Sequence, residues 1–233
     1  MTEYKRGLVA GIPIGLGYLS VSFTFGIIAI SYGLNVWEAT LISMTNVTSA
    51  GQFAGIQTMM LPGRYLEMLI SQMTINARYS FMSIALSQKL DERFKGIWRW
   101  ILGFFVTDEI FAVAISEEKV SRSFFAGLAT LPYLGWSIGT ALGAIMGNVL
   151  PQRVLSALGL ALYGMFVAIV VPVMKTERAV ILAVVIAAAI SCAFTFIPLL
   201  SGVSTGLVVT IAAIISAAVV SIIKPVEDEG GAA

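Results

Sequence analysis

The stretch AVILAVVIAAAISCAFTFIPLL, residues 179–200, has no charged side chain at any position. A helix of about 20 apolar residues is long enough to cross the hydrocarbon core of a bilayer. Predominantly apolar stretches also cover most of the remaining chain, at about residues 7–31, 37–61, 65–87, 100–116, 123–150, 154–174 and 203–223. The sequence therefore predicts an all-α protein, a polytopic bundle of transmembrane helices.

The composition excludes several classes of protein. Of the 233 residues, 58% are hydrophobic and 12% are charged, whereas an ordinary soluble domain has about 25% charged residues. The loops are too short for a soluble domain, so we expect one transmembrane domain at residues 1–225 and a solvated tail at 226–233. A net charge of +1 gives no electrostatic basis for nucleic-acid binding.

Enzymatic activity is not expected either. Gly135-Trp136-Ser137-Ile138-Gly139 matches the nucleophile-elbow pattern of serine hydrolases, but the chain contains no histidine to act as the base. Histidine is also the commonest metal ligand. We therefore predict neither a catalytic residue nor a metal or other cofactor.

The basic residues indicate how the segments cross, because lysine and arginine in short loops favour the cytoplasmic side. If every segment crosses, the thirteen basic residues other than Arg78 divide eight inside and five outside. If segments 37–61 and 100–116 each enter and leave by one face, eleven lie inside, and only Arg64 and Arg153 lie outside. We therefore predict about six full crossings plus two broken or re-entrant segments, with a cytoplasmic N-terminus.

The first of these segments contains the polar run Asn46-Val47-Thr48-Ser49-Ala50-Gly51-Gln52-Phe53. An unwound turn at Gly51 would expose amide N–H groups at the positive end of a half-helix, where a carboxylate can bind. Ser49, Gly51 and Gln52 are therefore candidate substrate-binding residues. Close helix packing by small residues is the alternative explanation.

Charged side chains in Asn76-Ala77-Arg78-Tyr79 and Thr107-Asp108-Glu109 interrupt two other apolar segments. Such groups are costly in hydrocarbon and usually face a bundle interior or a water-filled cavity. The alternatives are a structural ion pair between Arg78 and one of the acids, and an interfacial position for Asp108 and Glu109. Adjacent residues on a helix point about 100° apart, so the two acids are expected to have different partners.

Together these residues suit a zwitterionic ligand. The guanidinium of Arg78 can hold a carboxylate in a bidentate pair, with Asn76 nearby as a further hydrogen-bonding side chain. Asp108 or Glu109 can bind an ammonium group or carry a proton. With the many apolar side chains available, this chemistry predicts a hydrophobic amino acid as the substrate.

The run Asn46 to Phe53, the run Asn76 to Tyr79, Thr107-Asp108-Glu109-Ile110-Phe111-Ala112 and the run Phe196 to Gly202 resemble successive signatures of the AzlC family, in order and at comparable spacing. The family provides the large subunit of branched-chain amino acid exporters. The resemblance implies a prokaryotic inner-membrane permease that exports valine, leucine, isoleucine or related amino acids such as methionine, with a small AzlD-like membrane partner. Tyr79 stands where the family often has histidine, so a histidine-based proton relay does not carry over.

Glycines at intervals of four predict a smooth packing stripe along segment 123–150, formed by Gly135, Gly139, Gly143 and Gly147. Either another helix of the same chain or the small partner can cover it. Pro132 beside the stripe and Pro198 near the end of segment 179–200 are predicted kinks with possible hinge roles.

The mechanism that we expect is alternating access around a site at mid-depth, with export driven by the proton gradient through Asp108 or Glu109. Two other classes stay open, namely a passive cation or proton channel with an acidic ring and a purely structural membrane subunit. A second copy of the chain is a further candidate partner.

Overall fold

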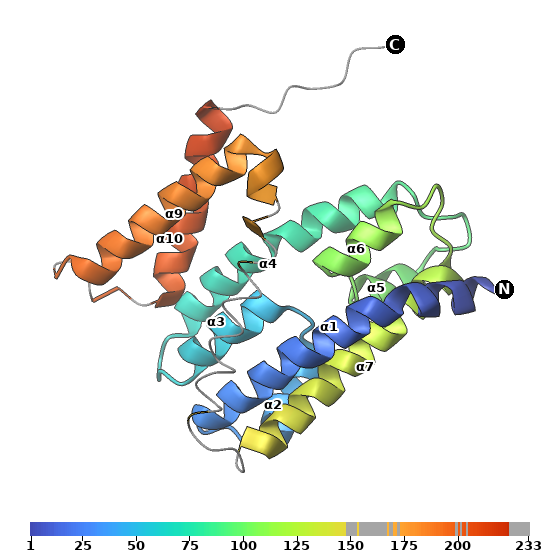
Figure 1. Ribbon diagram of the computed structural model, residues 1–233, viewed down its shortest axis with the longest axis horizontal. Helices are drawn as coiled ribbons and strands as arrows, with labels where there is room; N and C mark the ends of the chain where they lie inside the picture. The colour runs from blue at the N-terminus through green and yellow to red at the C-terminus, as the bar shows by residue number, and fades with distance from the viewer. Residues whose placement is uncertain are drawn as a thin grey trace.

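The computed structural model describes residues 1–147, 153, 167, 170–171, 173–198, 200, 202–203 and 205–223. Regular structure within these ranges is helical apart from one isolated bridge between Leu90 and Val120 (Figure 1). The helices are α1 (Glu3–Ser31), α2 (Val36–Thr45), α3 (Ser49–Met59), α4 (Tyr65–Ser87), α5 (Ile97–Gly103), α6 (Asp108–Ile115), α7 (Arg122–Gly147), α9 (Arg178–Phe196) and α10 (Thr205–Ile223). The predicted all-α class is confirmed.

Three helices, α1, α7 and α9, are long and apolar enough to cross a membrane. With 23 residues, α4 is also long enough, although it is more polar. Both segments that were predicted to be broken are divided, into α2 and α3 and into α5 and α6. Most of segment 154–174 and the whole tail at 226–233 lie outside the described residues. The number of crossings stays a prediction.

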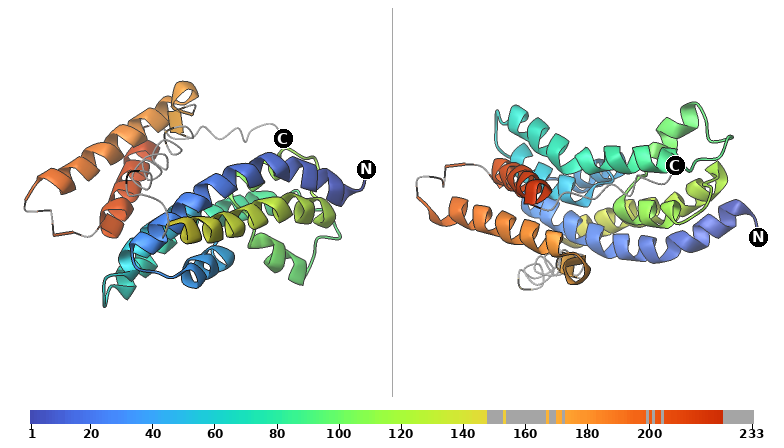
Figure 2. Two further views of the ribbon diagram at one scale, coloured as in Figure 1. Left: turned by 60° about the horizontal axis from the view of Figure 1, so that its bottom comes forward. Right: turned by 90° about the horizontal axis from the view of Figure 1, so that it is seen from above.

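Two parallel helices, α1 and α7, lie side by side along their length (Figures 1 and 2). Gly135, Gly139 and Gly143 of the predicted stripe pack directly on the α1 backbone, where an added Cβ would collide with main-chain atoms. From the other side, Gly7 and Gly26 approach the α7 backbone equally closely. The glycine stripe is therefore covered by a helix of the same chain.

The two prolines predicted as kinks lie in different structural settings. Pro132 is fully buried within α7, which continues past it to Gly147. Pro198 does not interrupt a helix, since α9 ends at Phe196. A proline disfavours the helical conformation of the residue before it, and Ile197 accordingly has an extended backbone. The predicted kink at Pro198 is therefore wrong.

One hairpin, formed by α2 and α3, lies at the C-terminal end of α1. Helix α2 starts there and ends about halfway along α7, where the Tyr133 hydroxyl donates to the carbonyl of Met44 at 3.0 Å. Helix α3 leads back, so that the side chain of Met60 just beyond it lies against Gly33. Phe25, Phe53 and Ile56 belong to the apolar core at this end.

A second hairpin, formed by α5 and α6, lies at the opposite end of the α1–α7 pair. Its tip also reaches Tyr133, whose ring packs edge-on against Phe104 and Phe105. Both of its ends lie together, because Lys89 before α5 donates to the carbonyl of Ile115 at 2.6 Å. The two broken segments therefore enter from opposite ends and meet halfway along α7.

The remaining helices connect and flank these hairpins. After α3, α4 runs from one end of the molecule to the other and leads to the α5–α6 hairpin (Figure 1). Helices α9 and α10 pack on each other, and α10 also contacts α3 and α4. Helix α4 contacts the second helix of each hairpin, α3 and α6, from the side opposite α1 (Figure 2).

Candidate functional site

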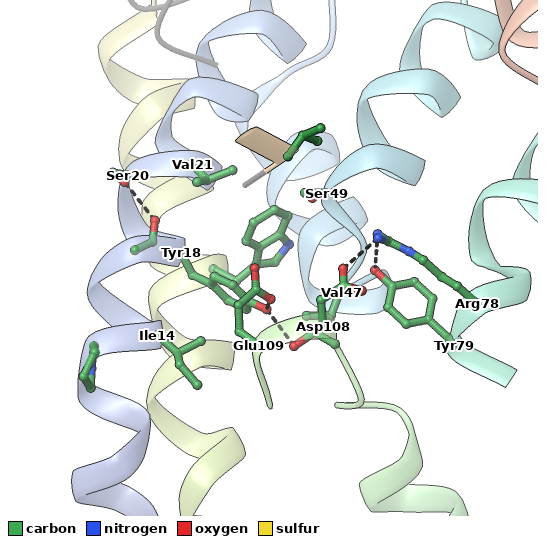
Figure 3. A pocket seen from close by; sticks show the side chains of 15 residues that line it. Ile14, Tyr18, Ser20, Val21, Val47, Ser49, Arg78, Tyr79, Asp108 and Glu109 are labelled. Atoms are coloured by element: carbon green, nitrogen blue, oxygen red, sulfur yellow. Dashed lines mark hydrogen bonds and ion pairs between the residues drawn. The ribbon is translucent and has the colours of Figure 1, made fainter. Parts of the chain in front are cut away.

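A cavity of about 680 Å³ lies where the two hairpin tips meet (Figure 3). Its volume is within the range of roughly 300–1,000 Å³ that is typical of small-molecule sites. Side chains from α1, α4, α6 and α7 line it, together with the start of α3. The lining residues are Pro13, Ile14, Gly17, Tyr18, Ser20, Val21, Val47, Ser49, Arg78, Tyr79, Thr107, Asp108, Glu109, Trp136 and Val170.

Both half-helices that start at the cavity, α3 and α6, begin with a threonine cap. Thr48 and Thr107 have extended backbones, and their hydroxyls accept from the N–H groups of Gly51 at 3.3 Å and Ile110 at 3.4 Å. Threonine suits this position because its side-chain oxygen replaces a missing intrahelical partner. Two helix N-termini, each the positive end of its dipole, therefore border one cavity from opposite directions.

An ion pair joins α4 to α6 at this cavity. Arg78 Nη1 lies 2.9 Å from Asp108 Oδ2, and the two side chains are 43% and 39% exposed. The guanidinium also lies over the ring of Tyr79, 4.9 Å from its centroid, and donates to the Tyr79 hydroxyl at 3.2 Å. Arg78 thus pairs with Asp108 rather than with Glu109, and water or a ligand can reach the pair.

Glu109 has a different environment on the other side of α6. Its carboxylate hydrogen bonds to the hydroxyl of Tyr18 from α1, and this phenol oxygen lies 2.6 Å from Thr107 Oγ1. Tyr18 is only 8% exposed and packs edge-on against Trp136. The two adjacent acids therefore face different helices, as expected from their angular separation.

Gln52 does not line the large cavity. Its amide is fully buried, accepting from Trp136 Nε1 at 2.8 Å and donating to Ser43 Oγ at 2.7 Å. Ser43 in turn lies 2.7 Å from the Thr140 hydroxyl. Gln52 thus attaches the start of α3 to α2 and α7, with its hydrogen bonds directed away from the cavity.

Gly51 and Asn76 also lie outside the lining of this cavity. Gly51 is not the unwound residue, because the break precedes Thr48 and Gly51 is in the first turn of α3. Its missing Cβ instead makes room for Gln72 of α4, which donates to the Gly51 carbonyl at 2.8 Å. Asn76 donates to the carbonyl of Gln72 at 2.9 Å. Gln72 therefore connects α4 with the tip of the first hairpin at Gly51, whereas the hydrogen bonds of Asn76 stay within α4.

Sequence reasoning missed Tyr18 and Trp136. Both lie in apolar stretches, where aromatic residues are ordinary. A tyrosine hydroxyl at membrane depth nevertheless requires a hydrogen-bond partner, which is the signal that Tyr18 offered. Within the part of the chain that the structure describes, no cluster of three potential metal-ligating side chains is present.

Comparison with known proteins places the chain among membrane proteins. The family model described as AzlC protein matches residues 13–150. A membrane protein of Archaeoglobus fulgidus is 34% identical over 85% of this chain and 87% of its own length. Inner membrane protein YgaZ of Escherichia coli is 27% identical over 70% of each chain, and a Helicobacter pylori membrane protein is 27% identical over 64% of this chain and 66% of its own. No solved structure matches.

Proposed function

The chain belongs to the AzlC family of membrane proteins, and we propose that it is a secondary transporter that exports branched-chain or other hydrophobic amino acids. The observation that carries the proposal is the cavity between two half-helix tips, which contains one cation and two acids with separate partners. A zwitterion matches that arrangement. The proposed location is the inner membrane of a prokaryote, with the N-terminus in the cytoplasm.

The proposed substrate pose follows from the charges around the cavity. The carboxylate of the substrate lies between Arg78 and the N-terminus of α3 at Ser49, where N–H groups of the first turn have no intrahelical partner. The ammonium group lies at Glu109. Apolar side chains of α1 and Val47 surround the aliphatic part of the substrate, and Trp136 closes one wall.

Alternating access is the mechanism that this geometry favours. Because the hairpins enter from opposite ends, movement of α2–α3 opens one side of the cavity, and movement of α5–α6 opens the other. The parallel α1–α7 pair, with its close backbone contacts, serves as the stationary part. Export is coupled to protons, and a small AzlD-like membrane subunit assists the chain.

Counterflow in proteoliposomes tests the proposed function. Vesicles preloaded with unlabelled leucine should accumulate labelled leucine, valine, isoleucine and methionine but not labelled lysine. The experiment is run with the chain alone, with a small membrane partner alone, and with both together. Saturable exchange supports the transporter. Flux that increases linearly with concentration would indicate a channel, and flux that depends only on the partner would indicate a structural subunit.

A further inference from the structure

Tyr18 connects the α6 half-helix to the α1–α7 pair at the centre of the cavity. Its ring is held by the edge-on contact with Trp136, whose centroid is 5.3 Å away. Its hydroxyl lies between the carboxylate of Glu109 and Thr107 Oγ1 (Figure 3). The hydroxyl therefore has a fixed position, whereas the carboxylate beside it is exposed to the cavity.

The two acids differ in what balances their charge. Asp108 has the guanidinium of Arg78 as its counter-ion. Among the described residues, Glu109 forms no ion pair, and its partner is the neutral phenol. The titratable groups around Glu109 are Tyr18 from α1, Arg78 and Tyr79 from α4, and the adjacent Asp108, while α7 contributes only Trp136. The cavity thus has one carboxylate available for an incoming positive charge.

A hydroxyl is suited to hold such a carboxylate in both protonation states. It donates to an ionised carboxylate and accepts from a protonated carboxyl, because its oxygen has both a proton and lone pairs. The position of Glu109 can therefore be retained when a proton binds. A phenylalanine ring would keep the contact with Trp136 but could satisfy neither state.

We propose that Tyr18 is a positioning residue that presents Glu109 as the single acid for which a proton and the ammonium group of the substrate compete, while Asp108 remains the counter-ion of Arg78. This inference depends on the proposed function for the identity of the ammonium ligand. Competition at one carboxylate provides the basis of antiport, because either a proton or the substrate is bound, but not both.

Carbodiimide labelling tests the role of Tyr18 independently of transport. Dicyclohexylcarbodiimide modifies protonated carboxyl groups in apolar surroundings, and peptide mass spectrometry identifies the modified residue. Glu109 should be labelled more than Asp108, in a pH-dependent manner. In Tyr18→Phe the carboxylate of Glu109 loses its hydrogen-bond donor, so the pH dependence of its labelling should differ from that of the wild type.

Tyr4→Phe is the matched control, because the Tyr4 hydroxyl also joins α1 to α7, 3.1 Å from Thr130 Oγ1, but lies away from the cavity. Tyr4→Phe should leave the pH dependence of Glu109 labelling unchanged. Superimposable labelling curves for Tyr18→Phe and the wild type, or stronger labelling of Asp108 than of Glu109, would overturn the inference about Tyr18.

Substrate protection separates this inference from the proposed function. Leucine should reduce labelling of Glu109 and should do so less effectively as the pH falls. If leucine gives no protection and no counterflow, the proposed substrate is wrong, and the shift in Tyr18→Phe still decides the role of Tyr18. In transport, Tyr18→Phe should shift the pH profile of exchange, whereas Tyr4→Phe should not.

Discussion

The two hairpins use one backbone design with different electrostatics. Each has a short helix, a break, and a second helix that starts at the cavity with a capping threonine, Thr48 or Thr107. After the cap, α3 continues with Ser49-Ala50-Gly51, whereas α6 continues with Asp108-Glu109. The first tip therefore keeps the positive potential of a helix N-terminus, and the second offsets it with its own acids.

This difference shows how one site can have two polarities. A cavity lined by two uncharged half-helix N-termini would bind anions from both sides. With acids on one tip only, and with Arg78 extending from α4 between the tips (Figure 3), one side of the cavity is suited to an anion and the other side is suited to a cation.

Removal of the cation should have the largest effect. Arg78→Ala removes the proposed carboxylate partner and leaves Asp108 without its counter-ion, so both tips become unsuited to a zwitterion. Because the pair is partly exposed, we expect the loss to lie below that of a fully buried pair, at about 100-fold in counterflow of leucine.

Arg64→Ala provides the control for this prediction. Arg64 precedes the same helix, α4, and forms a 3.0 Å ion pair with Glu67 away from the cavity. It should leave counterflow within about twofold of the wild type. Equal losses in the two variants would mean that charge on α4 matters only for folding or insertion.

The next effect concerns the space available at the two tips. An added Cβ at Gly51 would lie 2.6 Å from Thr48 Cγ2 and 2.8 Å from Gln72 Oε1. Gly51→Ala should therefore displace the α3 cap and lower the free energy of unfolding by about 1–3 kcal/mol. Thermal unfolding in detergent micelles measures the change.

Gly103→Ala is the corresponding change in the second hairpin. No heavy atom outside its own helix backbone lies within 4 Å of a Cβ at Gly103. Alanine is the better helix former by about 0.5–1 kcal/mol, so the unfolding midpoint should stay the same or rise. A midpoint for Gly51→Ala as high as that for Gly103→Ala would contradict the tight packing of the first tip.

Local features of the fold could be predicted from the sequence. Polar residues near Thr48 and at Thr107 interrupt apolar runs, and the structure breaks the helices at these points. Segment 65–87 coincides with α4, since Leu61-Pro62-Gly63-Arg64 and the charged residues after Gln88 limit it on both sides. These features are determined by residues close together along the chain, so one sequence is enough to predict them.

Partnerships across the bundle could not be predicted in the same way. From the sequence, either Asp108 or Glu109 could form the ion pair with Arg78. The rotation of α6 relative to α4 places Asp108 next to Arg78. The contact between Tyr18 and Glu109 depends on the position of α1, which the glycines shared with α7 determine. Gln52 was expected to bind the substrate, but its amide oxygen instead accepts a hydrogen bond from Trp136, which is distant in the sequence.

The smallest expected effect distinguishes the two caps themselves. Thr48→Val and Thr107→Val both remove the capping oxygen, which typically costs about 1 kcal/mol. Thr107 has in addition the 2.6 Å contact with Tyr18, whereas the second partner of Thr48, the Tyr79 hydroxyl, lies at 3.4 Å. We therefore expect Thr107→Val to lower the unfolding midpoint more than Thr48→Val, and serine at either position to restore most of the loss.

The same order should appear in counterflow, because only Thr107 also contacts the group that holds Glu109. The reverse order in both measurements would mean that the first tip, despite its lack of charge, is the more sensitive half of the site.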